Sequence, residues 1–224
     1  MCSKKSRQVY VVSGYSGVGK NSLLKMALED VSESVELAKS CTTRYPRTDD
    51  EKYIFLSIEH FEDMRQKGEF IEVNTYSGNH YGTSKREVER ILETGKNVIL
   101  EIDTNGYKQV LSSGLFEKEN IHSIFIVAKA EELLSRLKKR NTEDMQKIIA
   151  RIKNAIGETA DIGLYDFVLE NNDFEQALNQ LKMFLSGKEL KISDSFDAEK
   201  FIIEANEIVR KYTSAWNYFR VIKV

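Results

Sequence analysis

The chain has 224 residues and a mass of 25.8 kDa, enough for one domain with an elaboration or for two small domains. Its hydrophobic fraction of 41% and charged fraction of 30% exclude extended disorder, collagen-like repeats and a dominant coiled coil. The 33 basic and 35 acidic residues give a net charge of -2 at pH 7, which lacks the positive excess of a dedicated nucleic-acid binder. Any anion site must therefore be local.

The sequence shows no sign of export or of a membrane partner. Cys2 and Cys41 have neither zinc-site nor disulfide-framework spacing. The first eight residues form a short, basic segment that contains no apolar signal core. No window reaches the run of about 18 apolar residues that a membrane span requires. We therefore expect a cytoplasmic protein.

Apolar runs rich in β-branched residues lie at residues 9–13, 98–102 and 121–127, and a segment with helical periodicity follows each. This alternation predicts an α/β fold with a parallel sheet flanked by helices. Residues 35–84 differ, because short alternating pieces and the turn residues Ser77-Gly78-Asn79 indicate a small mixed β lobe with antiparallel pairing.

Signals for the starts and ends of helices occur from residue 84 onward. Ser84-Lys85-Arg86-Glu87 is a capping box that opens a helix, and Gly95 predicts its end. A charged helical segment at 131–156 breaks near Asn141, as a lid would. We expect a domain at 1–186, with a core at 1–34 and 85–186, the β lobe at about 35–84 and the lid at about 137–150. Residues 187–224 form an extension, whose apolar positions share a helical face: Phe201, Ala205, Ile208, Val209 and Tyr212.

A glycine-rich turn between the first strand and an apolar helix start resembles a P-loop. Such glycines let backbone N–H groups converge on a phosphate, and Lys20 adds a full charge for the β- and γ-phosphates of a nucleotide. Asn21 stands where Ser or Thr normally supplies a hydroxyl to magnesium, and its amide oxygen can serve instead. The expected ATP-binding residues here are Gly14, Ser16, Gly17, Val18, Gly19, Lys20, Asn21 and Ser22.

The next cluster, Ser40-Cys41-Thr42-Thr43-Arg44-Tyr45-Pro46-Arg47, holds two arginines suited to a phosphate dianion. Here the chain resembles the guanylate kinase family, whose acceptor site carries a similar motif. The resemblance runs to about residue 185. It continues through the motifs Tyr53-Ile54-Phe55, Glu69-Phe70-Ile71-Glu72, Tyr81-Gly82-Thr83, Glu101-Ile102-Asp103 and Arg136-Leu137-x-x-Arg140.

The resemblance implies ATP-dependent phosphorylation of GMP to GDP and a role for each matching residue. The phosphate of GMP would meet Arg44, Arg47, Tyr53 and Tyr81, and guanine would meet Ser40, Glu72, Thr83 and Asp103. The transferring phosphoryl group would lie among Lys20, Arg136, Arg140 and Arg151. Asn171 would lie near the adenine of ATP, and Asn21 and Glu101 near Mg²⁺.

Two other functions remain open at this point. A guanylate-kinase-like module without turnover would use the arginine-rich pocket to bind a nucleotide or a phosphorylated partner, and Asn21 with the short segment 48–52 supports that reading. A sugar-phosphate kinase is the weaker alternative, because the carboxylates and hydroxyls that match guanine would serve no purpose there. The expected partners are ATP and GMP, with no nucleic acid or membrane, in a monomer or a homodimer.

Overall fold

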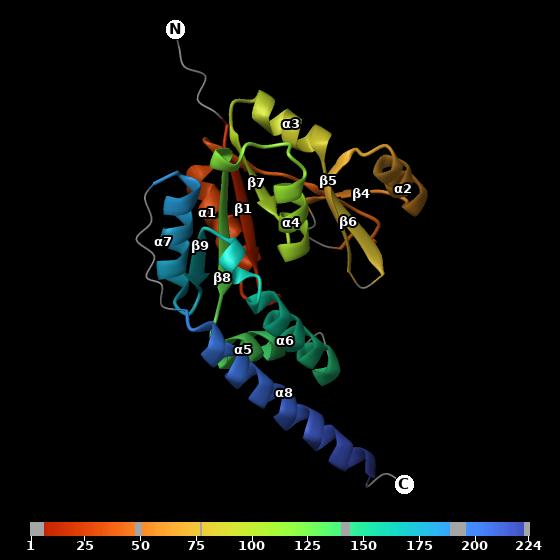
Figure 1. Ribbon diagram of the computed structural model, residues 1–224, viewed down its shortest axis with the longest axis vertical. Coiled ribbons are helices and arrows are strands. Elements are labelled where there is room, and N and C mark those ends of the chain that lie inside the picture. Colours follow the sequence, from red (N-terminus) through yellow and green to blue (C-terminus); the bar gives the residue numbers. More distant parts are fainter. Residues whose placement is uncertain (1–6, 48–50, 77, 140–143, 189–195, 222–224) are drawn as a thin grey trace. The chain divides into compact units, whose positions relative to one another are not determined.

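The computed structural model describes residues 7–47, 51–76, 78–139, 144–188 and 196–221, with side chains up to residue 213 in the last range (Figure 1). The strands are β1 (Val9–Gly14), β2 (Val35–Leu37), β3 (Ser40–Thr42), β4 (Tyr53–Phe55), β5 (Phe70–Tyr76), β6 (Asn79–Ser84), β7 (Asn97–Glu101), β8 (Ile121–Val127) and β9 (Phe167–Glu170). The helices are α1 (Lys20–Val31), α2 (Ile58–Gln66), α3 (Lys85–Glu93), α4 (Thr104–Ser112), α5 (Ala130–Lys139), α6 (Met145–Thr159), α7 (Phe174–Leu185) and α8 (Ala198–Val221). Short 3-10 helices span Lys118–Asn120 and Ile162–Leu164.

The larger sheet confirms the predicted α/β class. Its five strands have the order β2-β7-β1-β8-β9, and the pairs β2–β7, β1–β7 and β8–β9 are parallel. The three predicted apolar runs coincide with β1, β7 and β8 to within one residue at either end. Nearly all of their side chains are buried, as expected for strands covered on both faces.

The second sheet is mixed and has the order β4-β3-β6-β5. Strands β3 and β5 each pair with β6 in antiparallel fashion, whereas β3 and β4 are parallel. The parallel pair makes this sheet mixed, which confirms the predicted mixed β lobe. In the parallel pair, Ser40 lies opposite Tyr53 and Thr42 lies opposite Phe55.

Helix α3 begins and ends where its sequence predicts. The Ser84 side chain accepts a hydrogen bond from the Glu87 N–H at 3.2 Å, which confirms Ser84 as the N-cap. The Glu87 carboxylate accepts bonds from the Lys39 N–H and from Arg90. After the C-cap at Thr94, Gly95 adopts a φ of +88°.

The chain divides into two compact units, and each is described by itself. Unit 1 comprises Met1–Ser13, Leu28–Ser123 and Leu185–Lys188, and it includes the whole mixed sheet with α2, α3 and α4. Unit 2 comprises Gly14–Ala27, Ile124–Phe184 and Glu189–Val224. In unit 2, α5, α6 and α8 contact one another (Figure 1). The core, lobe, lid and extension boundaries given above stay predictions.

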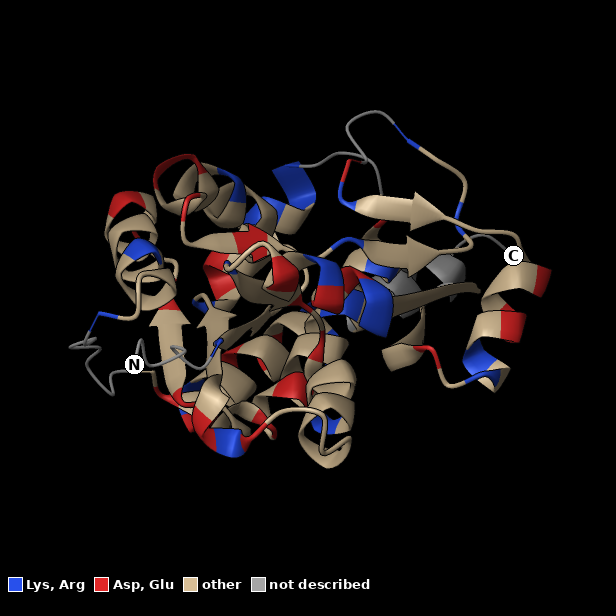
Figure 2. Ribbon diagram, turned by 90° about the horizontal axis from the view of Figure 1, so that it is seen from above, with Lys and Arg blue, Asp and Glu red and all other residues tan. Residues whose placement is uncertain are grey.

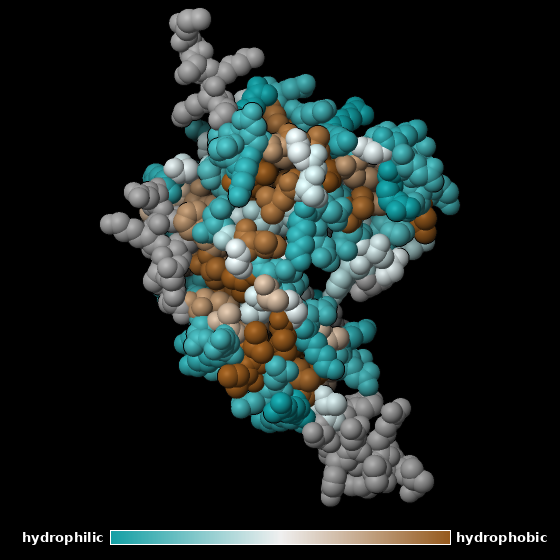
Figure 3. All heavy atoms as spheres, viewed as in Figure 1, coloured by the Kyte–Doolittle hydropathy of each residue, from teal (hydrophilic) through white to brown (hydrophobic). Residues whose placement is uncertain are grey.

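The surface drawn in Figure 3 is mostly hydrophilic, and hydrophobic residues also reach it over the first turns of α8, where Ile203 is 61% exposed. Among the described residues, no helix combines the length and apolar character needed to cross a bilayer.

Candidate active site

The loop between β1 and α1 is shaped by glycine. Gly14, Gly17 and Gly19 have φ angles of +154°, +92° and +98°, which other residues rarely adopt. A side chain at Gly19 would also place its Cβ 2.7 Å from Nδ2 of Asn171. The glycines therefore permit both the turn and the close approach of Asn171.

Two side chains hold the carbonyl of Val18. Its oxygen accepts a 2.7 Å hydrogen bond from Nη1 of Arg136 and a 2.8 Å bond from Nδ2 of Asn171. Arg136 also donates to the carbonyl of Asn171 at 2.7 Å and to the carboxylate of Glu132 at 2.8 Å. The Val18 carbonyl and the Gly19 N–H belong to the same trans peptide group, in which the N–H points opposite to the C=O. Because Arg136 and Asn171 bind the carbonyl, the Gly19 N–H points away from them.

Asn171 carries an unused acceptor. The residue is 1% exposed, and its Oδ1 has no hydrogen-bond partner in the described part of the chain. Because a buried polar atom without a partner is unfavourable, this oxygen suits a ligand that brings a hydrogen-bond donor.

A second arginine reaches the loop from α6. Nη1 of Arg151 donates to the hydroxyl of Ser16. Of the three arginines predicted around the phosphoryl group, Arg136 and Arg151 thus both contact the loop, from α5 and α6. Arg140 lies outside the described residues.

Helix α1 supplies an anion-binding terminus. It starts at Lys20, so the N–H groups of its first turn have no partner within the helix. Lys20 is half-buried, while Asn21 and Ser22 are exposed. These N–H groups and the helix dipole attract a negatively charged group such as a phosphate. We call residues 14–22 with Arg136, Arg151 and Asn171 the donor cluster.

In the mixed sheet of unit 1, strand register places four predicted residues in one row. Ser40 pairs with Tyr53 on one side and with Thr83 on the other, and Thr83 pairs with Glu72. Paired residues in neighbouring strands project from the same face of a sheet. Tyr81 lies two residues before Thr83 and so shares that face.

The Glu72 carboxylate is buried within this row. Oε1 accepts a 2.8 Å hydrogen bond from the Thr83 hydroxyl, and Glu72 is 5% exposed. Burial, and to a smaller extent the nearby Asp103 carboxylate, raises the pKa of Glu72 to about 7, against the lowering effect of the Thr83 bond. A Cβ at Gly106 would lie 2.9 Å from Oε2 and 3.2 Å from Cβ of Ile102, so a larger residue there would crowd the carboxylate.

The Asp103 carboxylate caps α4 and faces β5. Oδ1 accepts a 2.9 Å bond from the Gly106 N–H, and Oδ2 accepts a bond from Nδ2 of Asn74. Gln109 joins α4 to β5 by bonding the N–H and the carbonyl of Val73 at 3.0 and 2.8 Å. Sequence reasoning missed Asn74 and Gln109, although the spacing of Glu72 and Asn74 along a strand indicates a common face.

The guanidinium of Arg44 lies over the ring of Tyr53, with Cζ 5.0 Å from the centroid, and Nη1 donates to the carbonyl of Tyr45 at 2.9 Å. The Tyr53 and Tyr81 rings are in edge contact at 6.1 Å. Burial raises the pKa of Tyr53, so its hydroxyl stays protonated and can donate a hydrogen bond.

Arg47 is exposed. The acceptor cluster, as we name it, comprises Ser40, Arg44, Arg47, Tyr53, Glu72, Tyr81, Thr83 and Asp103.

Glu101 forms an ion pair that the sequence did not indicate. Its Oε2 lies 2.8 Å from Nζ of Lys52, and the Glu101 side chain is 13% exposed. Within the described ranges, no group of three or more His, Cys, Asp or Glu side chains is arranged to hold a metal ion.

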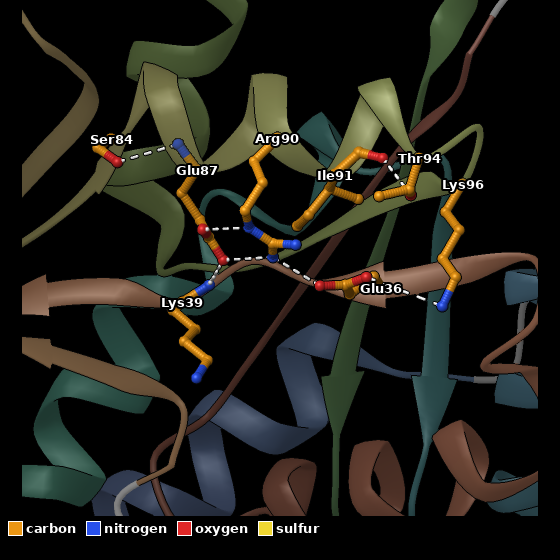
Figure 4. Close-up of polar contacts among 8 residues, drawn as sticks. All are labelled: Glu36, Lys39, Ser84, Glu87, Arg90, Ile91, Thr94 and Lys96. Atoms are coloured by element: carbon orange, nitrogen blue, oxygen red, sulfur yellow. Dashed lines mark hydrogen bonds and ion pairs between the residues drawn. The ribbon is translucent and has the colours of Figure 1, made fainter.

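Ion pairs and hydrogen bonds connect the two segments in which the chain passes between the larger sheet and the mixed sheet (Figure 4). Oε1 of Glu87 accepts a 3.1 Å bond from the Lys39 N–H, just before β3, and the Glu87 N–H bonds to Ser84, at the end of β6. Arg90 donates to Glu87 at 2.9 and 3.0 Å and to Glu36 on β2 at 2.6 Å. Glu87 thus connects the segment that enters the mixed sheet with the segment that leaves it.

Basic and acidic residues are interspersed over the ribbon rather than gathered into one broad patch (Figure 2). This distribution agrees with the near-neutral net charge. Local clusters of arginine and lysine, rather than a general field, must therefore attract an anionic ligand.

Comparison with known proteins gives a consistent result. Residues 6–188 match the family model described as guanylate kinase. The guanylate kinase of Fusobacterium nucleatum subsp. nucleatum is 40% identical over 176 residues, covering 77% of this chain and 92% of that protein. The guanylate kinase of Mesoplasma florum is 38% identical over 219 residues, covering 94% of this chain and 71% of that protein.

A solved structure agrees with these sequence matches. The crystal structure of guanylate kinase from Anaplasma phagocytophilum superposes with a TM-score of 0.61 at 27% identity. The match covers 83% of this chain and 87% of that one.

Proposed function

The chain belongs to the guanylate kinase family and phosphorylates GMP with ATP, and on this premise we propose which residues carry each part of the reaction. The donor cluster binds ATP and the acceptor cluster binds GMP. The observation that carries the assignment is the row formed by Tyr53, Ser40, Thr83 and Glu72 across four strands.

The donor cluster provides charge and directed N–H groups for the phosphates of ATP. Lys20 compensates the charge of the β- and γ-phosphates, and the first turn of α1 offers its N–H groups. Arg136 donates to the backbone carbonyls of Val18 and Asn171, so we assign it the orientation of the loop. Arg151 donates to the Ser16 hydroxyl, and we assign it contact with the phosphoryl group. The buried Oδ1 of Asn171 suits the 6-amino group of adenine, a hydrogen-bond donor.

The acceptor cluster distinguishes guanine from adenine. Guanine presents N1–H and a 2-amino group as donors, and the carboxylates of Glu72 and Asp103 are acceptors. The Thr83 hydroxyl already donates to Glu72, so Thr83 orients that carboxylate and Ser40 donates to guanine O6. Adenine offers an acceptor at N1, which would face a carboxylate without a donor, at a cost in free energy.

The GMP phosphate is held by guanidinium and phenol groups. Arg44, placed over Tyr53, and Arg47 offer planar forks for the phosphate oxygens. The hydroxyls of Tyr53 and Tyr81 donate further hydrogen bonds. The phosphate oxygen of GMP is itself the nucleophile, so catalysis consists of positioning and charge neutralisation, and no covalent intermediate is needed.

Magnesium is implied by the ATP-dependent reaction, and the residues present fit it. Mg²⁺ is usually held by one or two protein oxygens together with substrate phosphates, so a protein cage is unnecessary. Asn21, exposed in the first turn of α1, offers an amide oxygen. Glu101 offers a carboxylate that is paired with Lys52. When bound, the ion compensates charge on the donor phosphates.

A coupled assay tests these assignments with ATP and three acceptors: GMP, AMP and ribose 5-phosphate. We expect turnover with GMP, much weaker turnover with AMP and none with ribose 5-phosphate. Lys20→Ala should lose turnover and still bind GMP, because Lys20 belongs to the donor cluster. A wild type that binds GMP but makes no GDP at any magnesium concentration would instead be a binding module, and the proposal would fail.

A further inference from the structure

Helix α8 has no part in the assignments made so far. The family model ends at residue 188, and α8 begins at Ala198. It nevertheless buries Phe201, Ala205 and Ile208, which are 3%, 0% and 4% exposed. A helix that buries a continuous face is part of the folded unit, so its contacts are informative.

One of these contacts reaches the donor cluster directly. The ring of Phe201 stacks on the ring of Tyr15, with centroids 4.8 Å apart and planes at 14°. Tyr15 is the second residue of the phosphate-binding loop and is 1% exposed. Phe125 on β8 meets the Tyr15 ring edge to face at 5.2 Å. Residues from β8 and α8 therefore fix the plane of this ring.

The Tyr15 hydroxyl connects the same ring to α6. It lies 2.6 Å from the hydroxyl of Thr159, which donates its own hydrogen to the carbonyl of Ala155 at 2.7 Å. Thr159 has one hydroxyl hydrogen, so Tyr15 is the donor and Thr159 the acceptor. Burial raises the pKa of Tyr15, which keeps this donor protonated.

The backbone of Tyr15 transmits its position to the rest of the loop. Its N–H donates to the carbonyl of Ile126 at 3.2 Å, and its carbonyl accepts a bond from the Val18 N–H at 3.1 Å. Val18 is also the residue whose carbonyl Arg136 holds. A shift of the Tyr15 ring therefore moves the turn that presents the Gly19 N–H.

Helix α8 is held in place independently of Phe201. It contacts α5 and α6, and Nζ of Lys138 on α5 donates to the Tyr212 hydroxyl at 2.6 Å. A substitution at Phe201 can thus change the stacking contact while the rest of the helix stays docked.

We propose that Phe201 is a positioning residue for the donor site, acting through Tyr15 on the backbone of the phosphate-binding loop. This inference rests on the proposal above that residues 14–22 bind ATP. It gives the segment after the family domain a role in ATP affinity. Phe201 touches no substrate, so its effect is on the loop alone.

The test compares Phe201→Leu, which keeps apolar bulk but loses the stacked ring, with Ile208→Ala on the same buried face two turns later. Affinity for a non-hydrolysable ATP analogue, KM for ATP, KM for GMP and the melting temperature are measured for each. We expect Phe201→Leu to weaken binding of the analogue and raise KM for ATP by about two- to tenfold, with KM for GMP unchanged, since an aromatic pair contributes on this scale. Ile208→Ala should lower the melting temperature without changing affinity for the analogue.

Lys20→Ala separates failure of this inference from failure of the donor assignment. If Lys20→Ala leaves affinity for the analogue intact, the donor cluster itself is misassigned. If Lys20→Ala weakens binding but Phe201→Leu does not, the positioning role is wrong and α8 serves stability only. A Phe201→Leu variant that loses ATP and GMP affinity in equal measure would also overturn the inference, because the loss would then be general.

Discussion

The hydroxyl of Thr83 on β6 donates a 2.8 Å hydrogen bond to the carboxylate of Glu72 on β5, directly across the strand pair. The bond gives this buried carboxylate one hydrogen-bond partner and lowers its pKa. Burial has the larger effect, so the pKa of Glu72 is raised to about 7. Such a group is poised to accept hydrogen bonds from a ligand, because a ligand that donates to it favours the ionised form.

Glu72→Gln should lower kcat/KM for GMP by about one to two orders of magnitude, since the amide replaces a charge-assisted acceptor and brings a donor toward guanine's own donors. The much weaker use of AMP should change little. Steady-state kinetics with both acceptors measures the difference. A parallel fall for GMP and AMP would assign Glu72 to the structure of the lobe or to the phosphate, not to the base.

The same substitution should stabilise the free protein at high pH. Because the pKa of Glu72 is raised from 4.5 to about 7 in the folded state, its ionisation disfavours folding progressively as pH rises through that window. Removing the charge should therefore raise the free energy of unfolding by on the order of 2–3 kcal/mol at pH 8, and by much less at pH 5. Urea unfolding at the two pH values tests this, with the exposed Glu69→Gln as the control. An equal gain at both values would contradict the assigned pKa.

Arg44→Ala and Arg47→Ala should each raise KM for GMP by about 10- to 100-fold, since each removes a charge-assisted hydrogen bond to the acceptor phosphate. Affinity for ATP should stay the same. Arg86→Ala, an exposed arginine on α3, serves as the control for loss of one positive charge. If the Arg86 variant weakened GMP use as strongly, general attraction rather than specific contact would explain the effect.

Asn21→Thr should lower the magnesium concentration required for half-maximal velocity several-fold, because a hydroxyl oxygen replaces the amide at the position that the resemblance assigns to the metal. Asn21→Ala should raise it. Titration of initial velocity with MgCl₂ at fixed ATP provides the measurement. Identical titrations for all three proteins would show that residue 21 does not meet the ion.

Glu87→Gln should weaken the connection between the segment that enters the mixed sheet and the segment that leaves it. Burial opposes ionisation of Glu87, but hydrogen bonds from Arg90 and the Lys39 N–H outweigh it, so the pKa of Glu87 is lowered. A lowered pKa means that the stabilisation is present above about pH 4.5 and is lost as pH falls through the folded value. The Arg90 side chain is 46% exposed, so we expect a loss of only about 1 kcal/mol at pH 7. Glu89→Gln on the exposed side of α3 should have no effect, and equal unfolding curves for the two variants would refute this role.

The sequence alone determined the features that depend on neighbours along the chain. The glycine spacing, Lys20 and the start of α1 are contiguous, so the strand, loop and helix could be predicted with their chemistry. The N-cap bond from the Glu87 N–H to the Ser84 side chain is equally local. The acceptor residues were named by resemblance to a family, because no spacing along the chain relates Ser40 to Thr83.

Only the tertiary structure decided which distant residues meet. Strand register brings Ser40, Thr83 and Glu72 into one row, and packing of α4 on β5 sets Asn74 against Asp103. The hydrophobic pattern predicts which face of an element is buried, but it does not specify the partner or the register. Phe201 shows this most clearly. The sequence predicts that Phe201 lies on the apolar face of a helix, but 185 residues separate it from Tyr15, and only the folded chain brings the two rings into contact.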